Sequence, residues 1–256
     1  MREYGQLFAS AYDDLMSEIP YELYRDRIVK ILREAGIDDG LVAELGCGTG
    51  RMTRLLAASG YDCIGIDRSE EMLAEAMGQP QEEGQLPILW LHQDMRAFEL
   101  YGTVRAFVSV ADTMNYLTDP EDLYRTLKLV NNYLDPEGLF VFDLKTTHFF
   151  RDCLGNRTFF MENDDTAVVW DNAWYERDRI NSYELHLFHD RGDGLYERDF
   201  ELHEQRAYPR KQIAQIAERA GMVYVGAIDA DTGDEWNPDT RRGLVILREK
   251  GKRKEG

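Results

Sequence analysis

The sequence predicts an α/β fold: a mostly parallel β-sheet of seven strands, with helices on both faces and an inserted antiparallel β-sheet. Apolar runs of strand length alternate with helical stretches up to about residue 147, which is typical of a parallel sheet. From about residue 157 to 208 this alternation gives way to consecutive strands joined by polar turns. We therefore expect a core made of residues 1–147 and 209–256 and an inserted subdomain made of residues 148–208.

The composition indicates a soluble folded protein. Hydrophobic residues make up 43% of the 256 residues, yet no apolar run approaches the roughly 20 residues of a membrane span. The first 20 residues are too charged for a secretion signal, and the three cysteines, Cys47, Cys63 and Cys153, form no C-x-x-C pair. We expect a cytoplasmic monomer or homodimer with no membrane partner, no disulfide framework and no cysteine zinc site.

The charge balance bears on the choice of partner. Lys and Arg together number 30 against 48 Asp and Glu, which gives a formal net charge of −18. A polyanion would have to bind against this field, so we expect no nucleic-acid partner and favour a small-molecule substrate.

Helices and strands of the core follow from periodicity and capping signals. A helix is expected over residues 21–35, where apolar side chains recur at helical spacing before Gly36, and another begins at Asp119-Pro120, a capping residue followed by proline. Five apolar runs have the length of strands: residues 41–45, 61–66, 88–92, 106–110 and 139–144. After the insertion we expect a helix over residues 209–220 and two strands, residues 222–229 and 243–248, that pair antiparallel.

The inserted subdomain has a pattern of its own. Residues 157–206 hold 13 acidic and 6 basic side chains, so we expect one solvated face on its sheet. Four segments alternate apolar and polar residues around polar turns: residues 158–161, 167–174, 180–188 and 195–202. The insertion follows the fifth strand, at the sheet edge where open α/β sheets bind ligands. A lid over the site and a dimer interface are both compatible with it.

A glycine-rich loop is the strongest chemical signal. Residues 44–50 read Glu-Leu-Gly-Cys-Gly-Thr-Gly between the first strand and a helix expected over residues 51–59. Glycine allows a sharp turn and close approach to a ligand, and a helix N-terminus presents unpaired N–H groups. Alone, such a loop could equally be a tight turn.

The second signal is Asp67, 21 residues beyond Gly46, at the end of the second strand. A carboxylate there can accept hydrogen bonds from two ribose hydroxyls, so the two signals together favour a nucleoside ligand. Dinucleotide binders require glycine where Arg51 stands, and the Lys-Ser/Thr ending of a phosphate-binding loop is absent. NAD and nucleoside triphosphates are therefore disfavoured.

These motifs resemble the class I S-adenosylmethionine-dependent methyltransferases, which have a Rossmann-like sheet. The resemblance also rests on Gln93-Asp94-Met95 after the third strand, Val110-Ala111-Asp112 after the fourth and Asp135-Pro136-Glu137-Gly138 before the fifth. It covers residues 1–147 and 209–249. Within the class, Phe8-Ala9, Tyr12-Asp13, Asn115-Tyr116 and the position of the insertion are similar to a bacterial subgroup of YqeM-like proteins.

The resemblance implies how the loop would hold the methionine part of the cofactor. The backbone of Gly46, Cys47 and Gly48 would line it, and Glu44 would reach its amino group from beneath. Without a base beside it, Cys47 is interpreted as a small loop residue and not as a nucleophile.

The resemblance also implies the nucleoside contacts. Asp67, followed by Arg68, would hold the ribose, while Met72 and Met95 would enclose adenine and Asp94 would accept from its exocyclic amine. Without the motif beside them, the methionines would be interpreted as core residues.

The acceptor side is less defined. Ala111 and Asp112 would lie where the fourth strand opens towards the methyl group, although Asp112 could equally cap a helix. Five residues are candidates to face the acceptor, against packing or solvent exposure as the alternative: Tyr12, Asn115, Tyr116, His203 and Arg206.

Together these features predict a methyltransferase that uses S-adenosylmethionine and releases S-adenosylhomocysteine. The sulfonium is itself a good leaving group, so direct displacement needs alignment and exclusion of water but no metal. His186 and His189 fall on opposite faces of one strand and would not share a metal. No general base is evident, which favours a nitrogen acceptor over oxygen. The alternatives are a non-catalytic S-adenosylmethionine-binding regulator and a nucleotide-dependent oxidoreductase.

Overall fold

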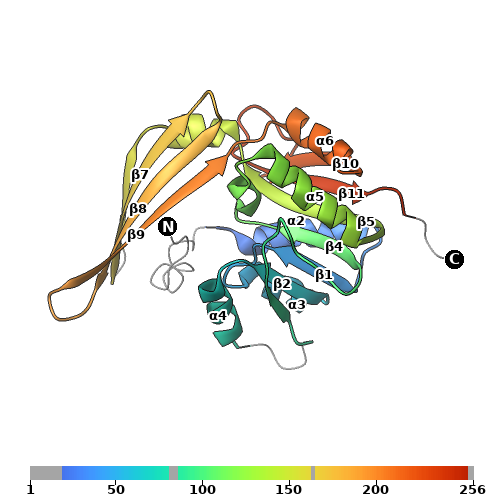
Figure 1. The fold of residues 1–256 in the computed structure, drawn as a ribbon, viewed down its shortest axis with the longest axis horizontal. Coiled ribbons are helices and arrows are strands. Elements are labelled where there is room, and N and C mark those ends of the chain that lie inside the picture. Colours follow the sequence, from blue (N-terminus) through green and yellow to red (C-terminus); the bar gives the residue numbers. More distant parts are fainter. Residues whose placement is uncertain (1–18, 81–85, 163–164, 253–256) are drawn as a thin grey trace.

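The computed structural model describes residues 19–80, 86–162 and 165–252, which contain two β-sheets (Figure 1). The larger has seven strands in the order β10-β11-β5-β4-β1-β2-β3. In chain order its strands are β1 (Leu41–Leu45), β2 (Asp62–Asp67), β3 (Leu89–His92), β4 (Val104–Ser109), β5 (Leu134–Lys145), β10 (Met222–Asp229) and β11 (Arg242–Glu249). Each of these strands matches an expected one, with ends displaced by a few residues.

The pairing pattern confirms a mostly parallel sheet. Strands β1 to β5 are parallel, whereas β11 pairs antiparallel with both β5 and β10. The largest difference from the predicted strand ends is in β5, which begins at Leu134 instead of residue 139. Its register against β4 shifts within the segment that contains Asp135-Pro136, so the apolar pattern detects only the regular half of this strand.

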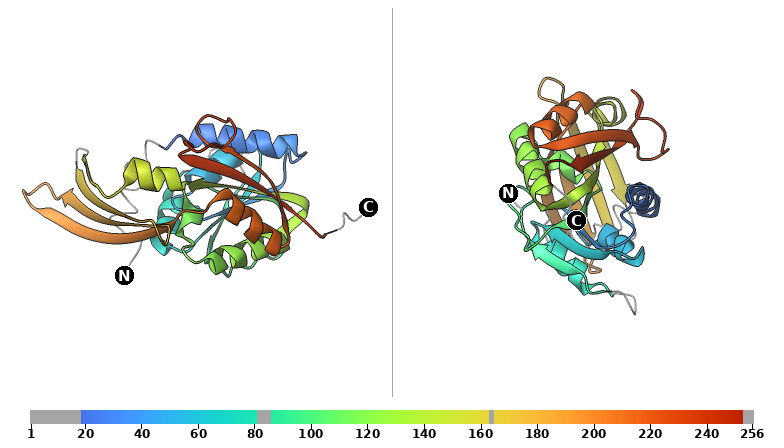
Figure 2. Two further views of the ribbon diagram at one scale, coloured as in Figure 1. Left: turned by 90° about the horizontal axis from the view of Figure 1, so that it is seen from above. Right: turned by 90° about the vertical axis from the view of Figure 1, so that its right-hand side faces the viewer.

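Helices cover both faces of the sheet (Figure 2). Helices α2 (Tyr21–Glu34) and α3 (Arg51–Ala58) pack on one face, and α5 (Pro120–Tyr133) and α6 (Arg210–Arg219) pack on the other. The Asp119 carboxylate accepts from the Glu121 N–H at the start of α5, as the Asp-Pro signal predicts. In the described ranges, every helix is too short or too polar to cross a membrane.

The second sheet is the expected antiparallel meander, and it projects from the core in Figures 1 and 2. Its strands are β6 (Thr158–Glu162), β7 (Thr166–Tyr175), β8 (Ile180–Asp190) and β9 (Tyr196–Arg206). Its inner face packs on Met72 of α4 (Glu70–Gly78) through Val168, Tyr183, Leu185 and Leu187. Two short helices were not predicted, η1 (Thr113–Tyr116) after β4 and the π-helix η2 (Phe149–Leu154) before β6.

Candidate functional site

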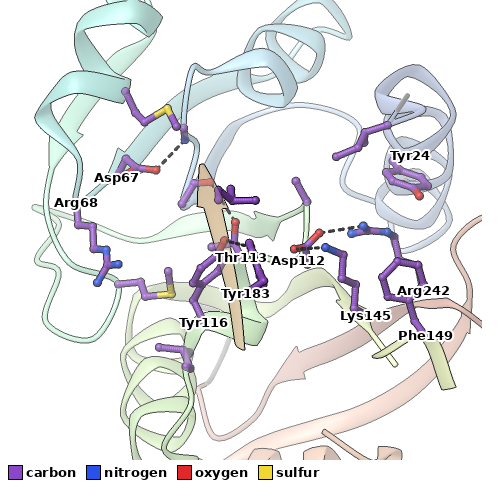
Figure 3. A pocket seen from close by; sticks show the side chains of 18 of the residues that line it. Tyr24, Asp67, Arg68, Asp112, Thr113, Tyr116, Lys145, Phe149, Tyr183 and Arg242 are labelled. Carbon is purple, nitrogen blue, oxygen red and sulfur yellow. Dashed lines mark hydrogen bonds and ion pairs between the residues drawn. The ribbon is translucent and has the colours of Figure 1, made fainter. Parts of the chain in front are cut away.

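A cavity of about 480 Å³ lies where the carboxyl ends of the parallel strands face the inserted sheet (Figure 3). The loops after β1, β2, β3 and β4 supply one side of its lining, and the insertion contributes Met161, Val168, Trp170, Tyr183 and Leu185. The insertion therefore presents an apolar and aromatic wall to the cavity. Ligands of open α/β sheets bind at this edge of the sheet.

The glycine loop after β1 is held close to η1. Gly46 and Gly48 both line the cavity and have φ of +66° and +53°, a region that glycine enters without strain. A Cβ on Gly46 would lie 2.1 Å from Cγ2 of Thr113, so no other residue fits there without a rearrangement. The loop thus exposes backbone to the cavity in place of side chains.

Asp67, at the end of β2, is fixed by two backbone groups. Its carboxylate accepts from Gly48 N–H at 2.7 Å and from Ser69 N–H at 2.8 Å. Burial raises the pKa of Asp67, and these N–H groups oppose the rise. Each carboxylate oxygen has two lone pairs, so Asp67 retains capacity for the hydroxyls of a ribose.

Glu44 and Cys47 lie behind the loop, outside the cavity lining among the described residues. Glu44 is 2% exposed and accepts a hydrogen bond from the Thr53 hydroxyl of α3. Burial raises the pKa of Glu44 to about 8 and that of the Cys47 thiol well above its ordinary value. Cys47 is therefore a buried thiol, and a contact of Glu44 with the cofactor stays a prediction.

The four residues expected beyond Asp67, namely Arg68, Met72, Asp94 and Met95, all line the cavity. The Asp94 carboxylate already accepts from the backbone and guanidinium of Arg96, which hold its pKa below the ordinary value against the effect of burial. The structure therefore brings together the residues assigned to adenine, whose individual contacts stay predictions.

The turn after β4 has an uncommon backbone. Ala111 and Asp112 have φ of +58° and +56°, which non-glycine residues rarely adopt. Their N–H groups donate to the two oxygens of Asp143 on β5, at 3.1 Å and 2.7 Å. Asp143 therefore holds the strained turn in place. The Asp112 side chain makes no helix cap, which decides against that alternative.

Asp112 instead belongs to a buried charge network at one end of the cavity. Its carboxylate lies 3.0 Å from Lys145 Nζ and 2.9 Å from Arg242 Nη2, and Arg242 Nη1 lies 2.6 Å from Asp143. Burial alone would raise the pKa of Asp112, but Lys145 and Arg242 hold it below the ordinary value. The carboxylate therefore stays ionised beside the expected position of the methyl group.

The acceptor-side candidates separate into distinct groups. Tyr116 lines the cavity, and its hydroxyl contacts Nδ1 of His203. His203 is fully buried, so the alternative of a solvent-exposed position is wrong for this residue. Tyr12 lies outside the described residues.

Two of the acceptor-side candidates do not reach the cavity. The Asn115 amide bonds the backbones of Lys145 and Arg206, which joins the ends of β5 and β9. The Arg206 guanidinium donates to the Thr118 carbonyl and covers the Tyr208 ring. Neither side chain belongs to the described lining, so facing the acceptor is corrected to a structural role for both.

Several functional candidates escaped the sequence analysis. Tyr183, Trp170, Lys145 and Arg242 line the cavity, and Glu201 contacts His203. A partial signal exists in β9, where Glu201, His203 and Gln205 occupy alternate positions and are all buried. Since polar residues occur on both faces of β9, the pattern alone could not identify the buried face.

Among the residues that the structure covers, no three His, Cys, Asp or Glu side chains are grouped so as to hold a metal ion.

Comparisons with known proteins agree with this geometry. A family described as "Methyltransferase domain" matches residues 42–138. A Bacillus subtilis (strain 168) protein described as "Putative methyltransferase YqeM" is 34% identical over 223 residues, 85% of each chain. A crystal structure of an S-adenosylmethionine-dependent methyltransferase from Clostridium acetobutylicum ATCC 824 superposes with a TM-score of 0.85 at 26% identity, covering 96% of this chain and 98% of that one.

A third relative is similar over a shorter stretch. It is a dTDP-3-amino-3,4,6-trideoxy-alpha-D-glucopyranose N,N-dimethyltransferase of Streptomyces venezuelae, 30% identical over 115 residues, which cover 44% of this chain and 46% of the relative.

Proposed function

The chain belongs to the S-adenosylmethionine-dependent methyltransferases, and we propose that it methylates a nitrogen of a small-molecule acceptor by direct displacement. The observation that carries this proposal is the cavity itself, which has cofactor-type residues on the core side and an aromatic wall on the other. A cavity of about 480 Å³ is of the size that small-molecule sites have.

The residues present fit the cofactor. Gly46 and Gly48 present backbone to the cavity, a Cβ on Gly46 would collide with Thr113, and Asp67 retains lone pairs for ribose hydroxyls. When bound, S-adenosylmethionine supplies a methyl group on a sulfonium that leaves as a neutral thioether. The protein's part is to orient the acceptor lone pair and exclude water.

One feature favours a small-molecule acceptor, and another favours nitrogen as the atom methylated. The described insertion lines the cavity with Trp170, Tyr183 and apolar side chains, against which the carbon frame of a small molecule can pack. The Streptomyces relative is named an N,N-dimethyltransferase, and the acceptor in its name is an amino sugar linked to dTDP. An amine is nucleophilic once neutral and needs no strong base, unlike a hydroxyl.

The insertion acts as a lid in this proposal. Its apolar residues pack on Met72, which the proposal assigns to the adenine site, and form the wall opposite the core. Such a wall excludes water from the reacting atoms.

A labelled transfer assay tests the proposal. The protein is incubated with S-adenosylmethionine carrying a ¹³C-methyl group and a panel of primary and secondary amines, namely glycine, sarcosine and a dTDP-linked amino sugar, and with a metabolite extract. We expect S-adenosylhomocysteine and an N-methylated product, identified by mass and ¹³C NMR. Label on oxygen would contradict the nitrogen assignment. Cofactor binding without transfer would favour the non-catalytic regulator.

A further inference from the structure

A chain of hydrogen bonds leads from the cavity into the inserted sheet. The Tyr183 hydroxyl of β8 lies 2.7 Å from the Tyr116 hydroxyl, and the latter lies 3.2 Å from Nδ1 of His203. Nε2 of His203 lies 2.7 Å from the Glu201 carboxylate on the same strand. Both tyrosines line the cavity (Figure 3). His203 and Glu201 are 0% and 1% exposed. This series of hydrogen bonds therefore begins at the cavity and ends at a buried carboxylate.

His203 is held in place by rings on two sides. Tyr183 stacks on it with centroids 5.0 Å apart and an interplanar angle of 12°, and Tyr116 meets it edge-on at 5.8 Å. The imidazole therefore cannot turn away from its two hydrogen-bond partners without displacing a tyrosine. Catalytic groups require this kind of support.

Valence fixes the direction of the chain. A carboxylate only accepts, so Nε2 of a neutral His203 carries the proton and Nδ1 is the acceptor. Tyr116 then donates its only hydroxyl proton to Nδ1, and Tyr183 must donate to the Tyr116 oxygen. This order leaves the lone pairs of the Tyr183 oxygen on the cavity side.

The charges around the chain keep Tyr183 a donor. Burial raises the pKa of Tyr183 well above its ordinary value, and Tyr116, Asp112 and Glu201, the titratable groups that face it, raise it further. Asp112 comes from the turn after β4 and Glu201 from β9, so the negative charges lie on two sides. The negative charges of Asp112 and Glu201 stabilise a proton that enters this series of hydrogen bonds.

We propose that Tyr183, Tyr116, His203 and Glu201 form a relay that removes a proton from the acceptor ammonium and so makes it nucleophilic. The ammonium N–H donates to the Tyr183 oxygen. As that proton transfers, the Tyr183 proton passes to Tyr116 and the Tyr116 proton passes to Nδ1 of His203. The products are a neutral amine and an imidazolium paired with the Glu201 carboxylate. Both tyrosines end as phenols, so charge and protons balance.

The geometry is that of a nucleophile, histidine and carboxylate triad in which tyrosines stand where the hydroxyl nucleophile would be. Here the hydroxyls carry protons and form no covalent bond. Tyr183 touches the acceptor and is a catalytic residue, whereas Tyr116, His203 and Glu201 act through it. The inference rests on the proposed function, because it requires an amine acceptor.

The first test needs no acceptor. NMR spectra of the full chain labelled with ¹⁵N-histidine are recorded with S-adenosylhomocysteine over a pH series, and His203→Asn identifies the signal of His203 among the five histidines. We expect the proton on Nε2 of the neutral imidazole, because Nε2 faces the Glu201 carboxylate. A proton on Nδ1 overturns the proposal.

The second test uses the amine of the panel that the wild-type protein methylates best. At pH 7, Tyr183→Phe, Tyr116→Phe and His203→Asn should lower kcat by about 100-fold or more. The loss should shrink as the pH rises above the pKa of the amine, because free amine needs no proton acceptor. His186→Asn, on the same strand as Tyr183 but bonded to Arg198, should keep the wild-type rate at every pH.

The outcomes separate the two proposals. A loss of the same size at every pH would mean that the residues only support the fold, and rates near wild type at pH 7 would mean that no relay operates. Either result overturns the relay and leaves N-methylation standing. If the protein methylates none of the panel amines, that result counts against the proposed function. The NMR measurement of the His203 tautomer then still tests the direction of the hydrogen bonds on its own.

Discussion

Asp67 lines the cavity at the end of β2, so its removal should weaken binding of the cofactor. A hydrogen bond to a charged group contributes roughly 1.5–3 kcal/mol, and Asp67→Ala should therefore weaken binding of S-adenosylmethionine and S-adenosylhomocysteine by at least about tenfold. Isothermal titration calorimetry measures both affinities.

Asp62→Ala is the matched control for Asp67. Asp62 begins the same strand at the opposite edge of the sheet, outside the described cavity lining, and its substitution should leave both affinities unchanged. Unchanged affinity in a folded Asp67→Ala protein would remove Asp67 from the site.

Glu44 should make the stability depend on pH. Burial raises its pKa from 4.5 to about 8 in the folded protein, so the folded state keeps a proton that the unfolded chain has lost. The resulting stabilisation is complete below about pH 4.5 and is lost as the pH rises through 8. Relative to wild type, Glu44→Gln should gain stability between pH 5 and pH 9, by at most about 5 kcal/mol.

Urea unfolding at several pH values without cofactor measures this effect of Glu44. Glu34→Gln, at the exposed end of α2, should follow the wild-type pH profile. A stability difference between wild type and Glu44→Gln that is the same at pH 5 and pH 9 would show that Glu44 is already ionised in the folded protein.

At the scale of elements, the inserted sheet should separate cofactor binding from transfer. Replacing residues 158–206 by a Gly/Ser linker removes the aromatic wall but none of the glycine loop, Asp67 or Met95. We expect affinity for S-adenosylhomocysteine within about tenfold of wild type and methyl transfer reduced by orders of magnitude. Calorimetry and the labelled assay measure the two quantities.

Two further variants keep this test informative if the deletion does not fold. Trp170→Ala combined with Leu185→Ala opens the wall while the sheet stays in place, and transfer should again fall more than cofactor affinity. Asp193→Ala, in the exposed turn between β8 and β9, should change neither. Transfer near the wild-type rate without the wall would mean that the insertion is no lid.

At the scale of the whole molecule, the net charge of −18 should prevent tight association with nucleic acids. Binding to a fluorescein-labelled RNA hairpin or DNA duplex is measured by anisotropy at about 0.15 M salt, and a Kd well above 1 μM is expected. Submicromolar binding that weakens as salt rises would contradict this prediction.

The sequence by itself determined the fold and named most of the residues that line the proposed cofactor half of the site. Apolar runs indicate which segments become strands. The glycines and Asp67 follow directly at the ends of two strands, and ligands of parallel sheets bind at the edge where the strands end. The resemblance to methyltransferases, together with this local pattern, was enough to name cavity-lining residues from Gly46 to Met95. Some contacts in this half are short in sequence, such as that of Gly48 with Asp67 across 19 positions.

Only the tertiary structure decided the acceptor half. His203 contacts Tyr116, 87 positions away in the sequence, and Arg242 contacts Asp112, 130 positions away. The local pattern of apolar and polar residues predicts neither contact. The same is true of Asn115, whose amide looks available in the sequence but is bonded to two backbone segments in the fold. Which face of β9 is buried depends on how the inserted sheet packs on α4 and η1, because a strand with polar residues on both faces has no preferred face of its own.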